Sequence, residues 1–398
     1  MSLAAEPAGL PSGAVPASGM VSATGTVLAS GAVPASGSVS ASGPISAVKT
    51  RVVSAPYRRP FQISSGISTE LVSLVVEVHT ADGAIGIGET SPMTAYTGET
   101  LAGVTAAIEE HLAPALIGRD PLDRAGAHVV MDTVLRGQHV AKSGLDIALY
   151  DLAGRLSGWP VHALLGGSVR DRVQTTWVVG LGTLDQMAAE AAEYAARGFR
   201  HLKVKGGQEP AKDLELIRAV RSAIPADAEL CLDANEGYDA ATALPYLAKM
   251  AQAGLTLLEQ PLPRWDLAGL VRLRERLEVR LMVDESMHSL HDALEIARRG
   301  AADVLNIKIL KVGGLHRALQ IANVAEAAGL AVKVGSMPEL GVATLAAVHL
   351  AAAVPGATVA ADLVGPLMVD EDPLAPTVFA DCDGWIDVPK RPGLGHDV

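Results

Sequence analysis

The spacing of apolar and polar residues along the chain changes near residue 174. From there to about residue 366, short apolar runs alternate with longer segments in which apolar residues recur at helical spacing. The eight apolar runs are VQTTWVVG, HLKVKGG, ELCLDAN, LTLLEQP, RLMVDES, DVLNIKIL, LAVKVGS and TVAADLVG. Strands that alternate with helices in this way predict parallel pairing and, in the simplest arrangement, a closed α/β barrel.

Helices are expected between these strands. The helix at 183–197 begins with a Thr183/Gln186 capping box and ends at Gly198. After the eighth strand the chain becomes rich in Pro and Gly (GWIDVPKRPGLG), so we expect the eighth helix to be missing or reduced. The remaining helices are predicted at about 210–224, 239–252, 265–277, 289–299, 313–328 and 339–354.

The chain before residue 170 has a different pattern. LVSLVVEVHT and AIGIGET flank an Asp-Gly turn and predict a β-hairpin, and helical patterns follow it. Residues 45–165 are therefore predicted to form an α+β domain, completed by 370–398, beside a barrel at 170–366. The helices of this domain are expected at about 98–116, 121–135 and 138–157.

Residues 1–44 repeat SGAVPASG at 12–19 and 30–37, and the segment consists mainly of Ser, Gly, Ala, Pro and Val with almost no charge. Such a segment cannot bury enough apolar surface to offset its chain entropy. We predict a disordered tail and assign it no function.

Composition narrows the class of protein. The 398 residues carry a formal net charge of −12, which argues against a nucleic-acid-binding face. There are only two cysteines, no run of eighteen apolar residues and no pattern of a signal peptide at the N-terminus. These features favour a cytoplasmic enzyme or binding protein, without nucleic-acid or membrane partners.

Charged residues stand at the ends of successive predicted strands, where barrel enzymes place their active sites. Lys203 and Lys205 lie two apart in HLKVKGG, so both side chains point to one face of the strand. From Lys205 the next charged strand ends follow at intervals of 28, 26, 25 and 24 residues, each one strand–helix unit. These residues are Asp233, Glu259, Asp284 (followed by Glu285) and Lys308.

Three carboxylates brought to one point repel each other unless a cation lies between them, and hard oxygen ligands suit Mg²⁺. A bound Mg²⁺ can hold a substrate carboxylate and offset the negative charge that forms when the adjacent carbon loses a proton. The base must then be neutral, and we expect the ammonium of Lys203 and partial burial to lower the pKa of Lys205. With Lys308 across the barrel, a proton can be removed on one side of a carbon and returned on the other.

Each residue alone also has an ordinary explanation: a lysine at a strand end is commonly a solvated rim residue, and an acid there is commonly a helix cap. Five such residues, each one strand–helix unit from the next, are unlike a chance arrangement and favour a shared site. Lys333, on the seventh strand, either faces the barrel interior or pairs with a neighbour.

The motifs resemble those of the enolase superfamily, and most of all its muconate-lactonizing subgroup within the mandelate racemase/muconate lactonizing enzyme family. The resemblance covers residues 45–398 and implies a modified TIM barrel, (β/α)7β, under an N-terminal α+β capping domain. The matching stretches are KVK at 203–205, the DAN of the third strand, LLEQPLP, VDES, NIKILKVGG and GSMPELGVATLAAVHLAAA.

The resemblance also implies roles for individual residues. Asp233, Glu259 and Asp284 are the implied Mg²⁺ ligands, and Asn235 and Glu285 are candidates for supporting them. Lys205 and Lys308 are the implied bases on opposite faces of the substrate. Lys203 is expected to contact the substrate carboxylate and to tune Lys205.

Two regions bear on the substrate. Family members that epimerise dipeptides carry D-x-D-x-P after the eighth strand, whereas this chain has Asp362-Leu-Val364-Gly-Pro366 and lacks the second acid. A loop at 57–69, beside SPMTAYTGET at 91–100, is expected to act as a lid that selects the substrate. The candidate specificity residues in this loop are Tyr57, Arg58, Arg59 and Phe61.

We therefore expect a Mg²⁺-dependent racemase or epimerase that removes the α-proton of a carboxylate substrate, an amino-acid derivative, through an enediolate. The alternatives are a muconate-type cycloisomerase or a dehydratase of the same superfamily, and a catalytically silent barrel that binds carboxylates. By analogy with other capped barrels, a homo-oligomer is expected.

Overall fold

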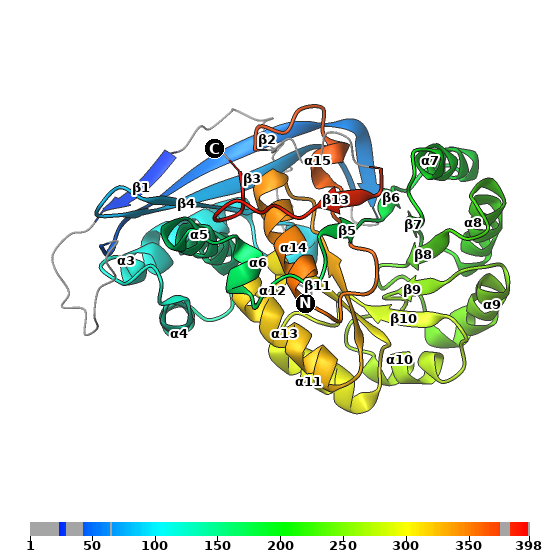
Figure 1. Ribbon diagram of the computed structural model, residues 1–398. Coiled ribbons are helices and arrows are strands. Elements are labelled where there is room, and N and C mark those ends of the chain that lie inside the picture. Colours follow the sequence, from blue (N-terminus) through cyan, green and yellow to red (C-terminus); the bar gives the residue numbers. More distant parts are fainter. Residues whose placement is uncertain (1–23, 29–42, 64–65, 375–382, 397–398) are drawn as a thin grey trace, which may run out of the picture.

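The computed structural model describes residues 24–28, 43–63, 66–374 and 383–396. A curled parallel sheet with helices on its outer side forms a modified TIM barrel, and an antiparallel sheet with its own helices caps it (Figure 1). No helix in these ranges combines the length and apolar character that a membrane span requires.

Within the described residues, seven parallel strands form the barrel wall and pair in chain order (Figure 1). The predicted eighth strand is a short extended segment, in which Val359 bridges to Lys333 and Ala361 bridges to Thr175, so it closes the wall between its two edges. The seven strands are β6 (Trp177–Val179), β7 (His201–Lys205), β8 (Glu229–Asp233), β9 (Leu257–Glu259), β10 (Arg280–Val283), β11 (Val304–Lys308) and β12 (Ala331–Gly335).

The helices of the barrel lie close to their predicted positions. The Thr183/Gln186 capping box is present at the first of them. After the closing segment, the described chain forms only a four-residue helix, α15 (Gly365–Met368), so the eighth helix is reduced as predicted. The others are α7 (Leu184–Ala196), α8 (Pro210–Ala223), α9 (Ala240–Gln252), α10 (Leu267–Arg274), α11 (Leu290–Arg299), α12 (Ile309–Val312), α13 (Leu315–Ala327) and α14 (Gly341–Ala353).

The capping domain is built on an antiparallel sheet in the order β1-β2-β3-β4. Near the end of the chain, β13 (Trp385–Asp387) pairs with β5 (Arg172–Gln174), which is the first part of the predicted first barrel strand. The sheet strands are β1 (Thr24–Leu28), β2 (Ile45–Ile63), β3 (Gly66–Thr80) and β4 (Ile85–Thr90). The helices are α1 (Thr94–Thr97), α2 (Leu101–Ala106), the π-helix η1 (Ala107–Leu112), α3 (Ala113–Leu116), α4 (Arg124–Val134), α5 (His139–Ser157) and α6 (Val161–Leu164).

Two sequence predictions for this domain need correction. The predicted loop at 57–69 is largely strand, because β2 and β3 continue as a two-stranded ribbon in which Phe61 pairs with Ser68. Residues 24–28, placed in the predicted disordered tail, form β1, which supplies the edge of β2 with backbone partners. The rest of the tail lies outside the described residues.

The capping sheet packs closely on α5 and joins the barrel through a buried carboxylate. A β-carbon at Gly88 of β4 would collide with the carbonyl oxygen of Gly144, so glycine lets α5 lie directly on the strand. The next residue, Glu89, accepts hydrogen bonds from the backbone N–H groups of Leu340 (2.6 Å) and Ala343 (2.9 Å) at the start of α14. Glu89 therefore links the two domains.

Burial raises the pKa of Glu89 from 4.5 to about 7, although three hydrogen bonds to the carboxylate oppose the shift. The folded protein therefore binds this proton more tightly than the unfolded chain. The resulting stability is complete below pH 4.5 and is lost as the pH rises through 7. Between pH 5 and pH 8 this loss amounts to roughly 2 to 3 kcal/mol.

We expect the difference in unfolding free energy between wild type and Glu89→Gln to fall by that amount over this pH interval, because glutamine does not titrate. Urea unfolding at pH 5, 6, 7 and 8 measures it. Glu278→Gln, at an exposed position, is the matched control and should differ from wild type equally at every pH. A pH-independent difference for Glu89→Gln would show that burial does not hold this proton.

Candidate active site

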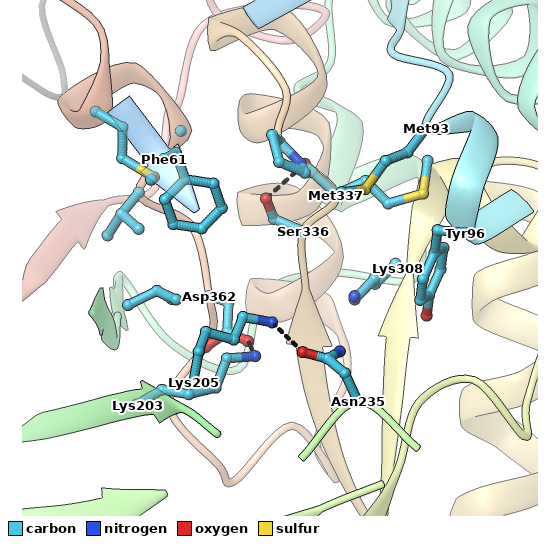
Figure 2. Close-up of a pocket in the computed structure, with 15 residues that line it drawn as sticks. Phe61, Met93, Tyr96, Lys203, Lys205, Asn235, Lys308, Ser336, Met337 and Asp362 are labelled. Carbon is cyan, nitrogen blue, oxygen red and sulfur yellow. Dashed lines mark hydrogen bonds and ion pairs between the residues drawn. The ribbon is translucent and has the colours of Figure 1, made fainter. Parts of the chain in front are cut away.

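A cavity opens at the carboxyl ends of the barrel strands, below the capping domain (Figure 2). The three lysines singled out from the sequence line it together with Asn235 and Asp362. Lys203 and Lys205 lie on one side of the cavity and Lys308 lies on the other (Figure 2). The remaining lining residues are Phe61, Met93, Tyr96, Val178, Ser336, Met337, Pro338, Val364, Gly365 and Met368.

Strand β7 brings two lysines to the same side because side chains alternate along a strand. Lys205 Nζ donates to Asp233 Oδ2 at 2.7 Å and to Asn235 Oδ1 at 3.0 Å. Lys203 is 3 % exposed, and its Nζ donates to Glu259 Oε2 at 2.9 Å. Lys203 Nζ also lies 3.4 Å from Asp233 Oδ2, so this lysine links two of the predicted acids.

The three predicted acids end consecutive strands. Asp233 and Glu259 are neighbours in the register of β8 and β9, and Asp284 directly follows β10. All three side chains are fully buried. The second carboxylate oxygen of Glu259 accepts from Asn306 Nδ2 at 2.8 Å, so β11 fixes its orientation.

Lys308 ends β11 on the opposite side of the cavity. Its Nζ lies 2.6 Å from Asp284 Oδ2 and 4.6 Å from the centre of the Tyr96 ring, which α1 supplies from the capping domain. Burial lowers the pKa of Lys308, but the carboxylates of Asp284, Glu259 and Glu285 together outweigh burial and raise that pKa above its ordinary range. Lys308 is therefore held as an ammonium here, whereas a base must be neutral.

A fourth lysine, Lys311, was not predicted to be part of the site. Its fully buried Nζ donates to Asp284 Oδ1 and to the Asp284 carbonyl oxygen, both at 2.7 Å, and to the Asn306 carbonyl oxygen at 3.2 Å. The signal in the sequence is its position three residues after Lys308 in the apolar run NIKILKVGG, one turn away on α12.

Lysine ammonium groups stabilise the charged form of two of the three acids, Asp284 and Asp233, whereas burial and the charge of Asp233 raise the pKa of Glu259. Burial raises the pKa of a carboxyl group, yet Lys308 and Lys311 hold the pKa of Asp284 well below its usual range. In the same way, Lys205 and Lys203 lower the pKa of Asp233. Among the described residues, no three Asp, Glu, His or Cys side chains already converge on one metal position. In this arrangement the acids face lysines, and their oxygen atoms are the hard donors that Mg²⁺ prefers.

Asn235 holds Lys205 in position, and Glu285 in turn holds Asn235. Asn235 has a φ of 41°, in the left-handed region, and its Nδ2 donates to Glu285 Oε1 at 2.9 Å. Glu285 Oε2 is buried without a hydrogen-bond partner in the described chain. Burial and the nearby charge of Asp284 raise the pKa of Glu285 to about 8. The amide thus connects Lys205 to a second, mainly protonated, carboxyl group.

Of the residues predicted to contact the substrate, Asp362 and Phe61 line the cavity and Tyr57 does not. Asp362 lines the cavity, and its Oδ2 accepts from Lys203 Nζ at 2.7 Å. Tyr57 is buried, packs on Phe61 with ring centres 5.9 Å apart, and does not line the cavity. Phe61 does line it, because the register of the ribbon shifts between Pro56 and Phe61 and changes which side chains face inward.

The two arginines of the same ribbon also lie outside the cavity lining. Arg58 Nε donates to the Val369 carbonyl oxygen at 2.7 Å, and Arg59 forms a long, exposed ion pair of 3.4 Å with Glu193. The second predicted lid segment, 91–100, contributes Met93 and Tyr96 to the cavity. The capping domain therefore meets the substrate space through apolar and aromatic side chains.

Comparison with known families agrees with this architecture. Residues 47–166 match the N-terminal domain model of mandelate racemase/muconate lactonizing enzyme, and residues 186–398 match the enolase C-terminal domain-like model. A chloromuconate cycloisomerase from Cupriavidus pinatubonensis is 33 % identical over 86 % of this chain and 93 % of its own length. An N-succinyl-L-Arg/Lys racemase from Bacillus cereus is 32 % identical over 88 % of this chain and 95 % of its own length.

Solved structures show the same similarity. The muconate lactonizing enzyme from Pseudomonas fluorescens, complexed with muconolactone, superposes with a TM-score of 0.86 at 34 % identity, covering 90 % of this chain and 97 % of the other. A dipeptide epimerase from Enterococcus faecalis, complexed with Mg and L-Leu-L-Tyr, gives 0.84 at 35 %, covering 87 % and 98 %. The chain thus belongs to the mandelate racemase/muconate lactonizing enzyme family of the enolase superfamily, and it is an isomerase of that superfamily.

Proposed function

We propose that the protein is a Mg²⁺-dependent racemase or epimerase that moves the α-proton of an amino-acid derivative carrying a free carboxylate. The observation that carries this proposal is the placement of Lys205 and Lys308 on opposite sides of one cavity, each beside a buried carboxylate (Figure 2). Inversion at a carbon needs one group on each face, and these two lysines meet that need.

Asp233, Glu259 and Asp284 are the proposed metal ligands. Their full burial and their charge suit a hard divalent cation, because an isolated buried carboxylate is otherwise costly. When bound there, Mg²⁺ would offset the second negative charge of the enediolate and take over carboxylate oxygens that now hold lysines protonated.

The lysines then carry the proton. In one direction, neutral Lys205 accepts the α-proton, and the electron pair of the C–H bond moves into the carboxylate to form the enediolate. The ammonium of Lys308 returns a proton to the opposite face, which restores the carboxylate with inverted configuration. Lys203, which contacts two of the acids, is placed to hold the substrate carboxylate, and Asn235 positions Lys205.

A cycloisomerase is the second candidate, and a specific observation favours it. Several relatives that match most of the chain are chloromuconate or muconate cycloisomerases. Lys203, Lys205 and Lys308 also suit a substrate with two carboxylates. A dehydratase would use the same lysines as base and acid, whereas a silent barrel would bind a carboxylate and move no proton.

Incubation with Mg²⁺ in D₂O tests the proposal, with a panel of N-acyl amino acids, dipeptides, proline derivatives and cis,cis-muconate. NMR follows deuterium at the α-carbon, and polarimetry follows the configuration. Deuterium incorporation with loss of optical rotation is the expected result. Lactone formation from muconate would support the cycloisomerase instead, and loss of water would support a dehydratase. The absence of proton exchange and of any other reaction across the panel would leave only a binding protein.

A further inference from the structure

We infer that Lys333 makes Asp362 unavailable to a substrate ammonium group, so that the substrate carries an uncharged N-acyl group at this end of the cavity. The inference rests on the proposed function and names its substrate class. It assigns to Lys333 the role of a specificity-determining residue that acts through Asp362.

Lys333 lies in the middle of β12 with its side chain inside the barrel, and it is only 1 % exposed. Its Nζ lies 2.7 Å from Asp362 Oδ1 and donates to Thr176 Oγ1 at 3.2 Å. Among the described residues, Lys333 forms no other ion pair within 4.0 Å. In the described chain, Asp362 is therefore the one carboxylate that forms an ion pair with Lys333.

Asp362 is clamped from the other side as well. Its Oδ2 accepts from Lys203 Nζ at 2.7 Å, so each oxygen has its own lysine. The backbone N–H of Asp362 donates to the Val334 carbonyl oxygen at 3.0 Å, which fixes the residue at the closing segment of the barrel. Both oxygen atoms of Asp362 are therefore already paired with buried ammonium groups, one of which, Lys203, also pairs with Glu259 and Asp233.

An ammonium group that approached Asp362 would find both carboxylate oxygens already paired, and the ammonium groups of Lys203 and Lys333 beside them would repel it. Asp362 is the one acid among the described residues that line the cavity, so the lining offers a substrate ammonium group no other carboxylate. The neighbouring wall is apolar. It is formed by Phe61, Val178, Met337, Val364 and Met368. This corner therefore suits an acyl carbonyl and its alkyl group, and it disfavours the free amine of a dipeptide.

N-acetyl-L-leucine and glycyl-L-leucine form a matched pair, because they differ only by an ammonium group in place of a hydrogen atom. For wild type we expect kcat/KM for α-proton exchange in D₂O to be at least tenfold higher with N-acetyl-L-leucine. Lys333→Met should reduce this preference at least fivefold, since Asp362 then keeps one cation. Lys333→Arg retains the charge and should restore the preference to within twofold of wild type.

Lys249→Met is the control, because Lys249 is exposed on α9 and does not line the cavity. Its preference should match that of wild type. The ratio of two substrates is the useful readout, because a loss of folded protein lowers both rates equally.

Equal rates with the two substrates in wild type, or a preference for glycyl-L-leucine, would overturn the inference while leaving the proposed function intact. An unchanged preference in Lys333→Met would overturn it too. Failure of both substrates, and of the wider panel, to exchange would instead overturn the proposed function. The wild-type ratio requires no variant, so the inference can be refuted even if Lys333→Met does not fold.

Discussion

Replacing Lys205 with Met is expected to abolish α-proton exchange from one enantiomer of the substrate while exchange from the other enantiomer continues. Lys308→Met should give the opposite pattern. The reason is geometric: the two amines lie on opposite sides of the cavity, so each can reach only one face of the α-carbon (Figure 2). Removal of a general base costs on the order of 10² to 10⁴ in rate.

The measurement is deuterium incorporation into each pure enantiomer, followed by NMR, with racemisation followed by polarimetry. Racemisation should be lost in both variants, because it needs both lysines. Lys212→Met, at an exposed position on α8, should behave as wild type. Loss of exchange from both enantiomers in a single variant would mean that one lysine serves both faces, and the assignment of two bases would be wrong.

The second large effect is expected for Glu259→Gln. Glutamine keeps the size of the side chain and can still accept from Asn306, but it removes one of the three buried charges proposed to hold the metal. Lys203 keeps its ion pair with Asp362 at 2.7 Å, so the variant does not leave this lysine without a partner. We expect Mg²⁺ affinity to fall at least about 100-fold and exchange to fall with it.

Isothermal titration with Mg²⁺ measures the affinity, and D₂O exchange at saturating Mg²⁺ measures the activity. Glu215→Gln, at an exposed position on α8, is the matched control and should titrate as wild type does. Wild-type affinity in Glu259→Gln would remove this residue from the proposed ligand set.

The residues at strand ends could be placed from the sequence because the barrel topology constrains them. Each strand–helix unit returns the chain to the same edge, so Asp233, Glu259 and Asp284 had to lie on consecutive strands once the eight units were recognised. The side-chain alternation in β7 likewise placed Lys203 and Lys205 together. These inferences used only local pattern and unit spacing.

The partners of Lys333 could not be placed in this way. Its contact with Asp362 depends on the closing segment, which is held by two isolated bridges, and strand propensity does not give that register. Lys311 was missed for a related reason. A lysine in an apolar run resembles a surface residue until Asp284 and the Asn306 carbonyl oxygen are seen around its Nζ.

The ribbon at 57–69 shows a further limit. Its Ser, Gly and Pro residues predicted a loop, whereas long-range pairing between β2 and β3 overrides local propensity there. The register shift after Pro56 then decides that Phe61, and not Tyr57, lines the cavity. A shift of one position exchanges the two faces of a strand, and the sequence alone does not specify it.

A crystal structure of the protein grown with Mg²⁺ tests the central claim most directly. The account predicts one Mg²⁺ about 2.1 Å from an oxygen of each of Asp233, Glu259 and Asp284, with Lys205 and Lys308 on opposite sides of the open coordination positions. A cation bound elsewhere, or carboxylates that keep only their lysine partners at saturating Mg²⁺, would contradict it.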